Sequence, residues 1–305
     1  MRFRAVASVG PLGFFLVSCL AIPGPVPDLV GEESEFLRLT QSPFFIQMSD
    51  PQLGFAGTPL YVQLAGYTWD DEPTAGEIAL FERAIAHANR LQPAFVVICG
   101  DLINRPGHEG QTAEFQRIAA LLDASIPLHL VAGNHDVGNH PTPESLRWYR
   151  ETFGPNWYSF RHGDVYGIVL DSSLIAGPAA AQKDADAQLA WLRDELVRAR
   201  ASGARHILAF QHHPYFLVDP DEEDAYFNVP LARRGLYLEL LRDAGVQAVF
   251  AGHYHRNGHG WDGELEMVTT GPVGKPLGDD PSGFRIVHPG PERIEHAYFG
   301  IAGAP

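Results

Sequence analysis

The sequence is poor in cysteine and in basic residues. Cysteine occurs twice in 305 residues, at Cys19 and Cys99, which is too few for a disulfide framework. The formal net charge is −15, and this argues against a nucleic-acid partner because phosphate backbones attract basic surfaces. Phosphorylated substrates are not excluded, since bound cations can supply positive charge locally. With 45% hydrophobic residues, the composition is that of a globular protein of one large or two smaller α/β domains.

The sequence also lacks an apolar run long enough to span a bilayer comfortably. The longest apolar run, residues 5–16, follows a short basic start and has the form of a secretory signal. It ends in L-V-S-C, which resembles the lipobox at which a lipoprotein signal is cut and Cys19 is acylated. We therefore expect an exported, membrane-anchored lipoprotein that faces the periplasm or the cell exterior. The alternative is ordinary cleavage near Ala21 and a soluble exported protein.

Three segments follow from this interpretation. Residues 1–18 are expected to form the lipoprotein-type signal peptide. Residues 19–41, rich in proline and glycine at first and then polar, are expected to form a tether. Residues 42–305 are expected to form the folded domain.

Strands and helices are predicted to alternate along this domain. Short apolar runs predict strands at 44–48, 95–99, 128–132, 158–161, 165–170, 206–210, 246–251, 267–270, 284–288 and 294–299. Helical spacing and capping residues predict helices that begin at Thr74 and Thr142, and helices near 112–124, 189–199 and 232–244. This alternation predicts crossover connections, and the short strands at the end indicate two packed sheets with helices outside.

Polar residues with metal-binding side chains follow five of these strands. They are Asp50, Asp101, Asn134 with His135, His212, and His253 with His255. A single Asp after a strand is usually a turn residue. In α/β folds, however, ligands bind beyond the carboxyl ends of the strands, so the whole series predicts one shared crevice. Oxygen and nitrogen donors of this kind suit Mn, Fe, Zn or Mg.

The order of these motifs resembles the calcineurin-like metallophosphoesterase superfamily, whose pattern is D-x-H, G-D-x-x-D, G-N-H-[DE], H-x-P and G-H-x-H. The resemblance covers residues 44–299. The segments S-D-P-Q-L-G, D-E-E-D-A-Y-F-N and A-G-H-Y-H-R-N are similar to a narrower group, the calcineurin-like phosphoesterase domain-containing proteins of Ser/Thr phosphatase type. This chain is similar to an exported bacterial relative of that group. The resemblance implies an α/β fold, a four-layer α/β/β/α sandwich of two mixed β-sheets flanked by helices.

The resemblance also implies two divalent metal ions with a shared ligand. Asp101 would bridge both ions, and Asp50 and His255 would hold the first. The ligands implied for the second ion are Asn134, His212 and His253. His212 is preferred to His213 because the family's ligand stands two residues before the proline. His135 would protonate the leaving group or steady the transition state; the alternative is a structural hydrogen bond.

This sequence departs from the family pattern at two positions. Gln52 replaces the usual histidine and offers only a neutral carbonyl oxygen, so the first ion is expected to bind loosely or to be a harder ion. Asn104 replaces the carboxylate that orients the catalytic histidine. Because Asn cannot stabilise an imidazolium by charge, we expect a lower His135 pKa and a more acidic activity optimum. Arg256, next to the last histidine, is expected to bind phosphate or to form a surface ion pair.

The resemblance implies a metal-dependent phosphoesterase that hydrolyses phosphate esters with a metal-activated water, most simply a phosphomonoesterase or phosphoprotein phosphatase. The expected partner is a phosphorylated small molecule or phosphoprotein, without nucleic acid. One alternative is a phosphodiesterase or nucleotide hydrolase with the same dinuclear site. Another is a non-catalytic metal-binding lipoprotein. The acidic run Asp221–Asp224 either forms a solvated loop or borders the crevice and selects substrates with basic flanks.

Overall fold

The computed structural model describes residues 30–41, 43–55 and 75–302. The predicted signal peptide, the predicted lipid-anchor residue Cys19 and the capping residue Thr74 lie outside these ranges. Within the described ranges, no helix combines the length and the apolar character that a membrane crossing requires.

One mixed sheet carries the first three strands and the last two. In the described chain its order is β11-β10-β1-β2-β3. The strands are β1 (Phe45–Met48), β2 (Val96–Cys99), β3 (Leu128–Val131), β10 (Gly283–Pro289) and β11 (Ile294–Gly300). Strands β1, β2 and β3 are parallel, whereas β10 is antiparallel to both β1 and β11. The carboxyl ends of β1, β2 and β3 therefore meet at one edge of the sheet.

The second mixed sheet has the order β4-β5-β6-β7-β9-β8. Its strands are β4 (Tyr158–His162), β5 (Val165–Val169), β6 (His206–Phe210), β7 (Ala248–Ala251), β8 (Gly258–Asp262) and β9 (Leu265–Thr269). Strands β5, β6, β7 and β9 are parallel, and the antiparallel strands β4 and β8 close the two edges. The predicted hairpin of β4 and β5 is confirmed.

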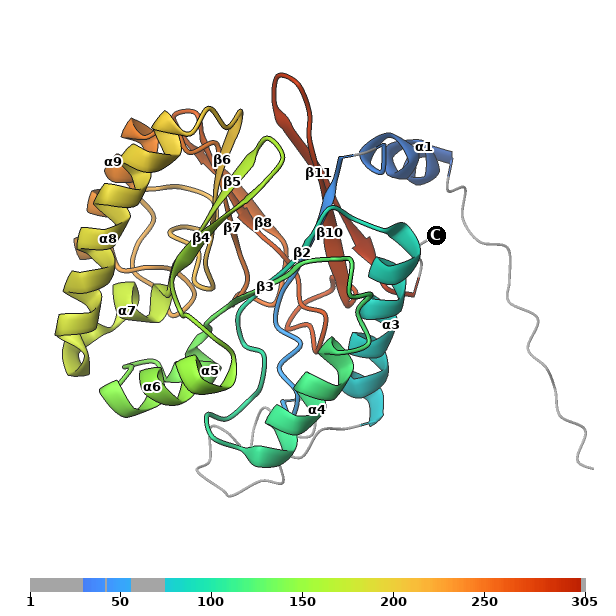
Figure 1. Ribbon diagram of the computed structural model, residues 1–305, viewed down its shortest axis with the longest axis horizontal. Coiled ribbons are helices and arrows are strands. Elements are labelled where there is room, and N and C mark those ends of the chain that lie inside the picture. The colour runs from blue at the N-terminus through green and yellow to red at the C-terminus, as the bar shows by residue number, and fades with distance from the viewer. Residues whose placement is uncertain (1–29, 42, 56–74, 303–305) are drawn as a thin grey trace, which may run out of the picture.

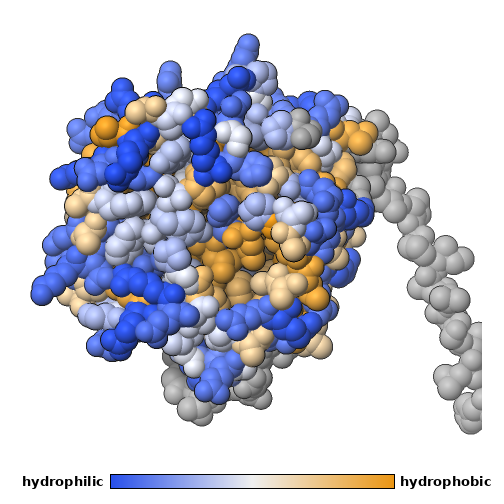
Figure 2. All heavy atoms as spheres, viewed as in Figure 1, coloured by the Kyte–Doolittle hydropathy of each residue, from blue (hydrophilic) through white to orange (hydrophobic). Residues whose placement is uncertain are grey.

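Helices cover the outer face of each sheet (Figure 1). Helices α3 (Ala75–Leu91) and α4 (Glu109–Ala119) pack on the first sheet, and α8 (Gln182–Ala201) and α9 (Leu231–Asp243) pack on the second. The remaining helical segments are α1 (Val30–Leu39), α5 (Asn134–Val137), α6 (Pro143–Thr152), α7 (Ser172–Ala176) and η1 (Pro178–Ala180). Figure 2 shows apolar residues gathered in the middle of the face seen in this view and hydrophilic side chains around its rim.

The two sheets bury an aromatic core between them. Phe45 and Phe95 stack with ring centroids 4.5 Å apart, and Phe45 meets Phe210 and Phe250 edge-on across the sheets at 5.9 Å. The next residue along β1, Ile46, faces the helices instead, because successive strand side chains point to opposite faces. Strands covered on both faces read as continuous apolar runs, which is why they were recognisable in the sequence. The predicted four-layer α/β/β/α sandwich is confirmed.

Local structure differs from expectation in two places. Helix α1 lies within the range predicted as a tether, and its Phe36 packs edge-on against Phe299 of β11 at 5.6 Å, so the folded part begins before residue 42. Strand β8, which was not predicted, contains two glycines and few residues that favour strands. It forms because the turn at Gly263 folds it back onto β9.

Candidate dinuclear metal centre

The predicted metal-binding residues come together at one edge of the sandwich. Loops after β1, β2 and β3 of one sheet meet loops after β6 and β7 of the other. All the side chains predicted as ligands are buried: Asp50, Asp101, Asn134, His212, His253 and His255. Parallel strands of both sheets point their carboxyl ends at this edge, so residues distant in the sequence share one crevice.

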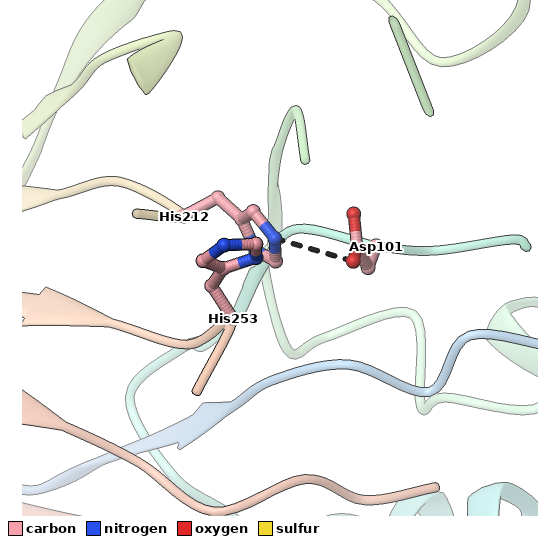
Figure 3. Close-up of side chains that lie close together, drawn as sticks. All are labelled: Asp101, His212 and His253. Atoms are coloured by element: carbon pink, nitrogen blue, oxygen red, sulfur yellow. Dashed lines mark ion pairs between the residues drawn. The ribbon is translucent and has the colours of Figure 1, made fainter. Parts of the chain in front are cut away.

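Two groups of three potential ligands share Asp101. One group is Asp101, His212 and His253; the other is Asp50, Asp101 and His255; within each group the ligand atoms lie within 4.8 Å of one another. Figure 3 shows His212 and His253 side by side, with His212 directed at Asp101. The His212 Nε2 atom lies 3.2 Å from Asp101 Oδ2, and His255 Nε2 lies 3.3 Å from Asp50 Oδ1. A carboxylate common to both groups is the arrangement that a bridged pair of cations requires.

Backbone carbonyls hold the imidazole rings of this site in place. The Nδ1 atoms of His212 and His255 lie 2.9 Å from the Cys99 carbonyl and 2.6 Å from the Lys275 carbonyl. Since a carbonyl can only accept, each ring nitrogen facing one carries the proton, and Nε2 remains available to a cation. In His253 the roles are reversed, because Nε2 lies 3.0 Å from the carbonyl of Tyr226. Such partners fix the tautomer of a ligating histidine.

Asn134 completes the second group. Its Oδ1 atom lies 3.0 Å from His212 Nε2, so an amide oxygen and an imidazole nitrogen face the same point. Asn134 begins the short helix α5, which places it just beyond β3. Its role as a ligand of the second ion stays a prediction.

The charges of these side chains are strongly coupled. Burial alone would raise the pKa of Asp50 and of Asp101, but nearby histidines outweigh burial, so both pKa values lie below the usual carboxyl value. Burial lowers the pKa of His212, yet Asp101 and Asp50 together raise it to about 9. Burial and the neighbouring His212 lower the pKa of His253 to about 3. Without metal, the site therefore holds two carboxylates, a protonated His212 and a neutral His253.

Backbone strain is concentrated at the site. Six non-glycine residues of the described chain have positive φ, and five of them lie here: Asp50, Gln52, Asp101, His253 and His255, with φ between 37° and 68°. Asp and His tolerate this left-handed region better than most residues. Each such residue costs about 1–3 kcal/mol and persists only where its surroundings hold it, which is typical of functional sites.

Two glycines of the motifs are required by close approach. A Cβ atom added to Gly133 would overlap the Asp101 carboxylate, and one added to Gly252 would overlap Ser49 Oγ and Asp50 Oδ2. Neither glycine has a left-handed φ. The glycines of G-N-H-D and G-H-Y-H therefore allow neighbouring loops to contact each other directly.

His135 lies in the same pocket as the candidate ligands. The pocket has a volume of about 100 Å³, and Asp101, His135, His253 and His255 contribute to its lining. The His135 backbone N–H donates to Asp101 Oδ1 at 2.8 Å, and its Nδ1 lies 2.7 Å from the backbone carbonyl of Asn104. His135 is thus oriented with Nε2 free, as a group that handles a proton requires.

The expected role of the Asn104 side chain is wrong. The backbone carbonyl of Asn104, and not its amide, holds the His135 ring. The amide oxygen instead accepts a 3.3 Å hydrogen bond from Gln52 Nε2. An argument from the charge of residue 104 to the pKa of His135 therefore loses its geometric basis, because the two side chains are not paired.

Gln52 itself fits the predicted role of a weak ligand. It is buried, lines the pocket, and its Oε1 atom has no hydrogen-bond partner in the described structure. A buried carbonyl oxygen without a partner costs about 1–3 kcal/mol, and a cation would satisfy it. The donor set, of carboxylate and amide oxygens with imidazole nitrogens, therefore fits two divalent ions.

The Arg256 guanidinium is bonded to a backbone carbonyl. Its Nε and a terminal nitrogen donate to the Leu277 carbonyl at 3.1 and 2.6 Å, and its guanidinium lies over the Tyr254 ring. Arg256 is not among the residues that line the pocket. His213, to which His212 was preferred as a ligand, has its Nδ1 atom 2.9 Å from Ser172 Oγ and belongs to neither ligand group.

Several pocket residues were not identified from the sequence. Phe55, Tyr226, Phe227 and Leu277 form its walls, and Tyr226 also supplies the carbonyl that holds His253. Their aromatic and apolar character is equally typical of core residues, so no pattern marked them. The acidic run next to Tyr226 had been noted only for its charge.

The acidic run is in part a structural element. The Glu222 carboxylate accepts hydrogen bonds from the N–H groups of Leu217 and Val218 and from Asn228 Nδ2. Asp224 accepts one from the Leu231 N–H at the start of α9. Only the other two acids of the run, both exposed, remain available for an electrostatic role.

Comparison with known proteins identifies the family. The model of the calcineurin-like phosphoesterase family matches residues 45–257. The chain belongs to this family. It is 38% identical over 277 residues to the serine/threonine-protein phosphatase CPPED1 of Bos taurus, covering 88% of this chain and 87% of that protein. The human protein of the same name is 38% identical over 267 residues, covering 85% and 83%.

Solved structures share the fold. A dimetal phosphatase from Danio rerio superposes with a TM-score of 0.64 at 18% identity, covering 85% of this chain and 96% of that one. Metallophosphoesterases of this family use a dinuclear metal site, and the groups around Asp101 are the candidate ligands in this chain. The protein is therefore a metallophosphoesterase, an enzyme that hydrolyses phosphate esters.

Proposed function

We propose that this metallophosphoesterase is a phosphomonoesterase that acts on phosphorylated small molecules or on phosphorylated Ser and Thr of proteins. The observation that carries the proposal is the pair of buried ligand groups that share Asp101 and face the same pocket as His135. When bound, two divalent ions activate a water for attack and stabilise the charge on the phosphate. Mn, Fe, Zn and Mg all suit the donor set.

The side chains of the chain have distinct roles in this proposal. Asp101 would serve both ions. Asp50, His255 and the carbonyl of Gln52 would hold the first ion, and Asn134, His212 and His253 would hold the second. His135, fixed through Nδ1 by the Asn104 carbonyl, gives a proton to the leaving oxygen from Nε2. Such a positioned acid contributes about 10²–10⁴ in rate.

The size of the pocket suits a phosphoryl group. About 100 Å³ corresponds to about three water molecules, well below the ~300 Å³ or more of pockets that enclose whole small ligands. A phosphoryl group fits, and the rest of the substrate would lie on the rim formed by Phe55, Tyr226, Phe227 and Leu277. The relatives described as Ser/Thr phosphatases, 38% identical over most of the chain, support a phosphomonoester as the substrate.

The decisive experiment compares ester classes with a metal-loaded protein. The mature chain, loaded in turn with Mn²⁺, Fe²⁺, Zn²⁺ and Mg²⁺, is assayed on p-nitrophenyl phosphate, its bis ester, nucleotides and phosphopeptides, with Asp101→Asn as the blank. We expect preferential hydrolysis of monoesters. Faster turnover of the bis ester or of nucleotides would assign a phosphodiesterase or nucleotide hydrolase. Two bound ions without any hydrolysis would assign a non-catalytic metal-binding protein.

We further propose that the protein is exported and anchored through a lipid on Cys19, with residues 1–18 as its signal peptide. The basic start, the apolar segment and the L-V-S-C quartet support this. Mass spectrometry of the protein from membranes should find a diacylated N-terminal cysteine, and Cys19→Ala should remain unprocessed. An unmodified N-terminus near residue 22 would establish ordinary cleavage instead.

A further inference from the structure

The amide of Gln52 has two chemically different ends in different surroundings. Its Nε2 end donates to Asn104 Oδ1 at 3.3 Å, while its Oε1 end is buried without a hydrogen-bond partner and the residue lines the metal pocket. Only the oxygen can bind a cation, because the NH₂ group has no free lone pair for one. The value of Gln52 as a ligand therefore depends on which end faces the pocket.

The backbone of Asn104 is held on several sides, which limits where its side chain can reach. It is buried, its N–H donates to the Leu53 carbonyl at 3.1 Å and to Gln111 Oε1 at 3.1 Å, and its own carbonyl meets His135. Its side-chain oxygen is then presented to Gln52 from a fixed backbone. The parallel bridge between Leu53 and Ile103 brings the two loops that carry these amides together.

We propose that Asn104 is a positioning residue for metal binding: by accepting from Gln52 Nε2 it turns Gln52 Oε1 toward the first metal site. This inference rests on the proposed metal site, and it gives residue 104 a role that differs from the expected one of orienting His135. Residues 52 and 104 act as a pair, the first as a weak neutral ligand and the second as the group that fixes its direction.

The proposal predicts different effects on the orientation of Gln52 for two substitutions at residue 104. In Asn104→Asp, both side-chain oxygens can only accept, so Gln52 Nε2 must face them and Oε1 must face the pocket. In Asn104→Leu, a side chain of similar size can accept nothing, and the Gln52 amide is free to turn. Loss of one neutral hydrogen bond typically corresponds to about a tenfold change in an equilibrium constant.

The test is a metal titration of the metal-free mature protein that does not depend on activity. Isothermal titration with Mn²⁺ should resolve two binding events, and the event weakened by Gln52→Ala identifies the first site. We expect Asn104→Leu to weaken that event about tenfold and to leave the other unchanged, so the second site serves as an internal control. Asn104→Asp should bind Mn²⁺ at the first site at least as tightly as the wild type.

A double-mutant cycle removes the effect of the added charge. Asp at residue 104 attracts a cation regardless of Gln52, so Asn104→Asp and Asn104→Leu are also measured in the Gln52→Ala background. If Asn104 orients Gln52, the ratio of first-site Mn²⁺ affinities between the two variants should be about tenfold smaller when Gln52 is absent. An undiminished difference would mean that charge alone acts, and the proposal would be wrong. If Asn104→Leu does not fold, Asn104→Ala, whose side chain also accepts no hydrogen bond, takes its place in the cycle.

Hydrolysis is measured separately on the same samples. If the cycle behaves as expected but no phosphate ester is hydrolysed, the positioning role stands and the proposed function fails. If phosphate esters are hydrolysed and the Mn²⁺ affinity of the first site is unchanged by substitution of residue 104, the proposed function stands and the positioning role fails. Thus the two conclusions can be distinguished.

Discussion

Replacing Asp101 by Asn tests the electrostatic design of the site. Asp101 is the ligand common to both groups, and Asn preserves its size and can still accept the His135 N–H at Oδ1. We expect the variant to lose tight binding of both ions and at least about 10³-fold in turnover, because shared metal ligation supplies several kcal/mol of stabilisation to the reaction.

The same substitution has a calculable effect on the metal-free protein. In the wild type, Asp101 and Asp50 raise the pKa of His212 from 6.5 to about 9 against the effect of burial. A histidine whose folded-state pKa is raised contributes stability that is complete below its unfolded value and is lost as pH rises through about 9. At pH 7 this contribution is about 3 kcal/mol, since two pH units separate pH 7 from that pKa.

Urea denaturation of metal-free wild type and Asp101→Asn at pH 7 and pH 10 measures this contribution. The difference in unfolding free energy between the two proteins should be larger at pH 7 than at pH 10, by at most about 3 kcal/mol because Asp50 remains next to His212. Titrations of groups that do not interact with Asp101 cancel in this comparison. If the difference is the same at both pH values, the charge of Asp101 does not keep His212 protonated in the folded protein. The electrostatic argument would then be refuted.

Four further variants, one of them a control in α9, test other parts of the structure. His135→Gln should lower kcat by about 10²–10⁴ while the protein retains two ions; loss of metal instead would make His135 a structural residue. Gly252→Ala should destabilise the protein by about 1–3 kcal/mol and weaken metal binding, because its Cβ would overlap the loop after β1. Gly235→Ala, in α9 with open space around it, is the matched control and should stabilise the protein by about 0.5–1 kcal/mol. Equal effects of Gly252→Ala and Gly235→Ala on stability would contradict the packing argument. Asp221→Asn combined with Glu223→Gln should raise KM for phosphopeptides with basic flanks and leave p-nitrophenyl phosphate unaffected; unchanged KM values would leave the acids without a role in substrate selection.

The fold could be predicted largely because the strands are covered on both faces. Such strands appear as apolar runs, and most of their boundaries agreed with the structure to within a few residues. Strand β8 could not be predicted, because a glycine-containing polar segment is held by its partner β9 and not by its own propensity. Helix α1 was missed for a similar reason: its short apolar face is stabilised by contact with β11 at the other end of the chain.

The sequence by itself determined which residues can bind metal, because the identities of Asp, Asn and His and their positions after strands are local facts. Only the tertiary structure decided which atoms of these residues meet. Asn104 was assigned to His135 from its motif, yet its amide contacts Gln52, since the direction of a side chain depends on neighbours from other loops. The pocket wall of Phe55, Tyr226 and Phe227 likewise became visible only in the folded chain, because aromatic residues have the same sequence signature in a core and at a binding site.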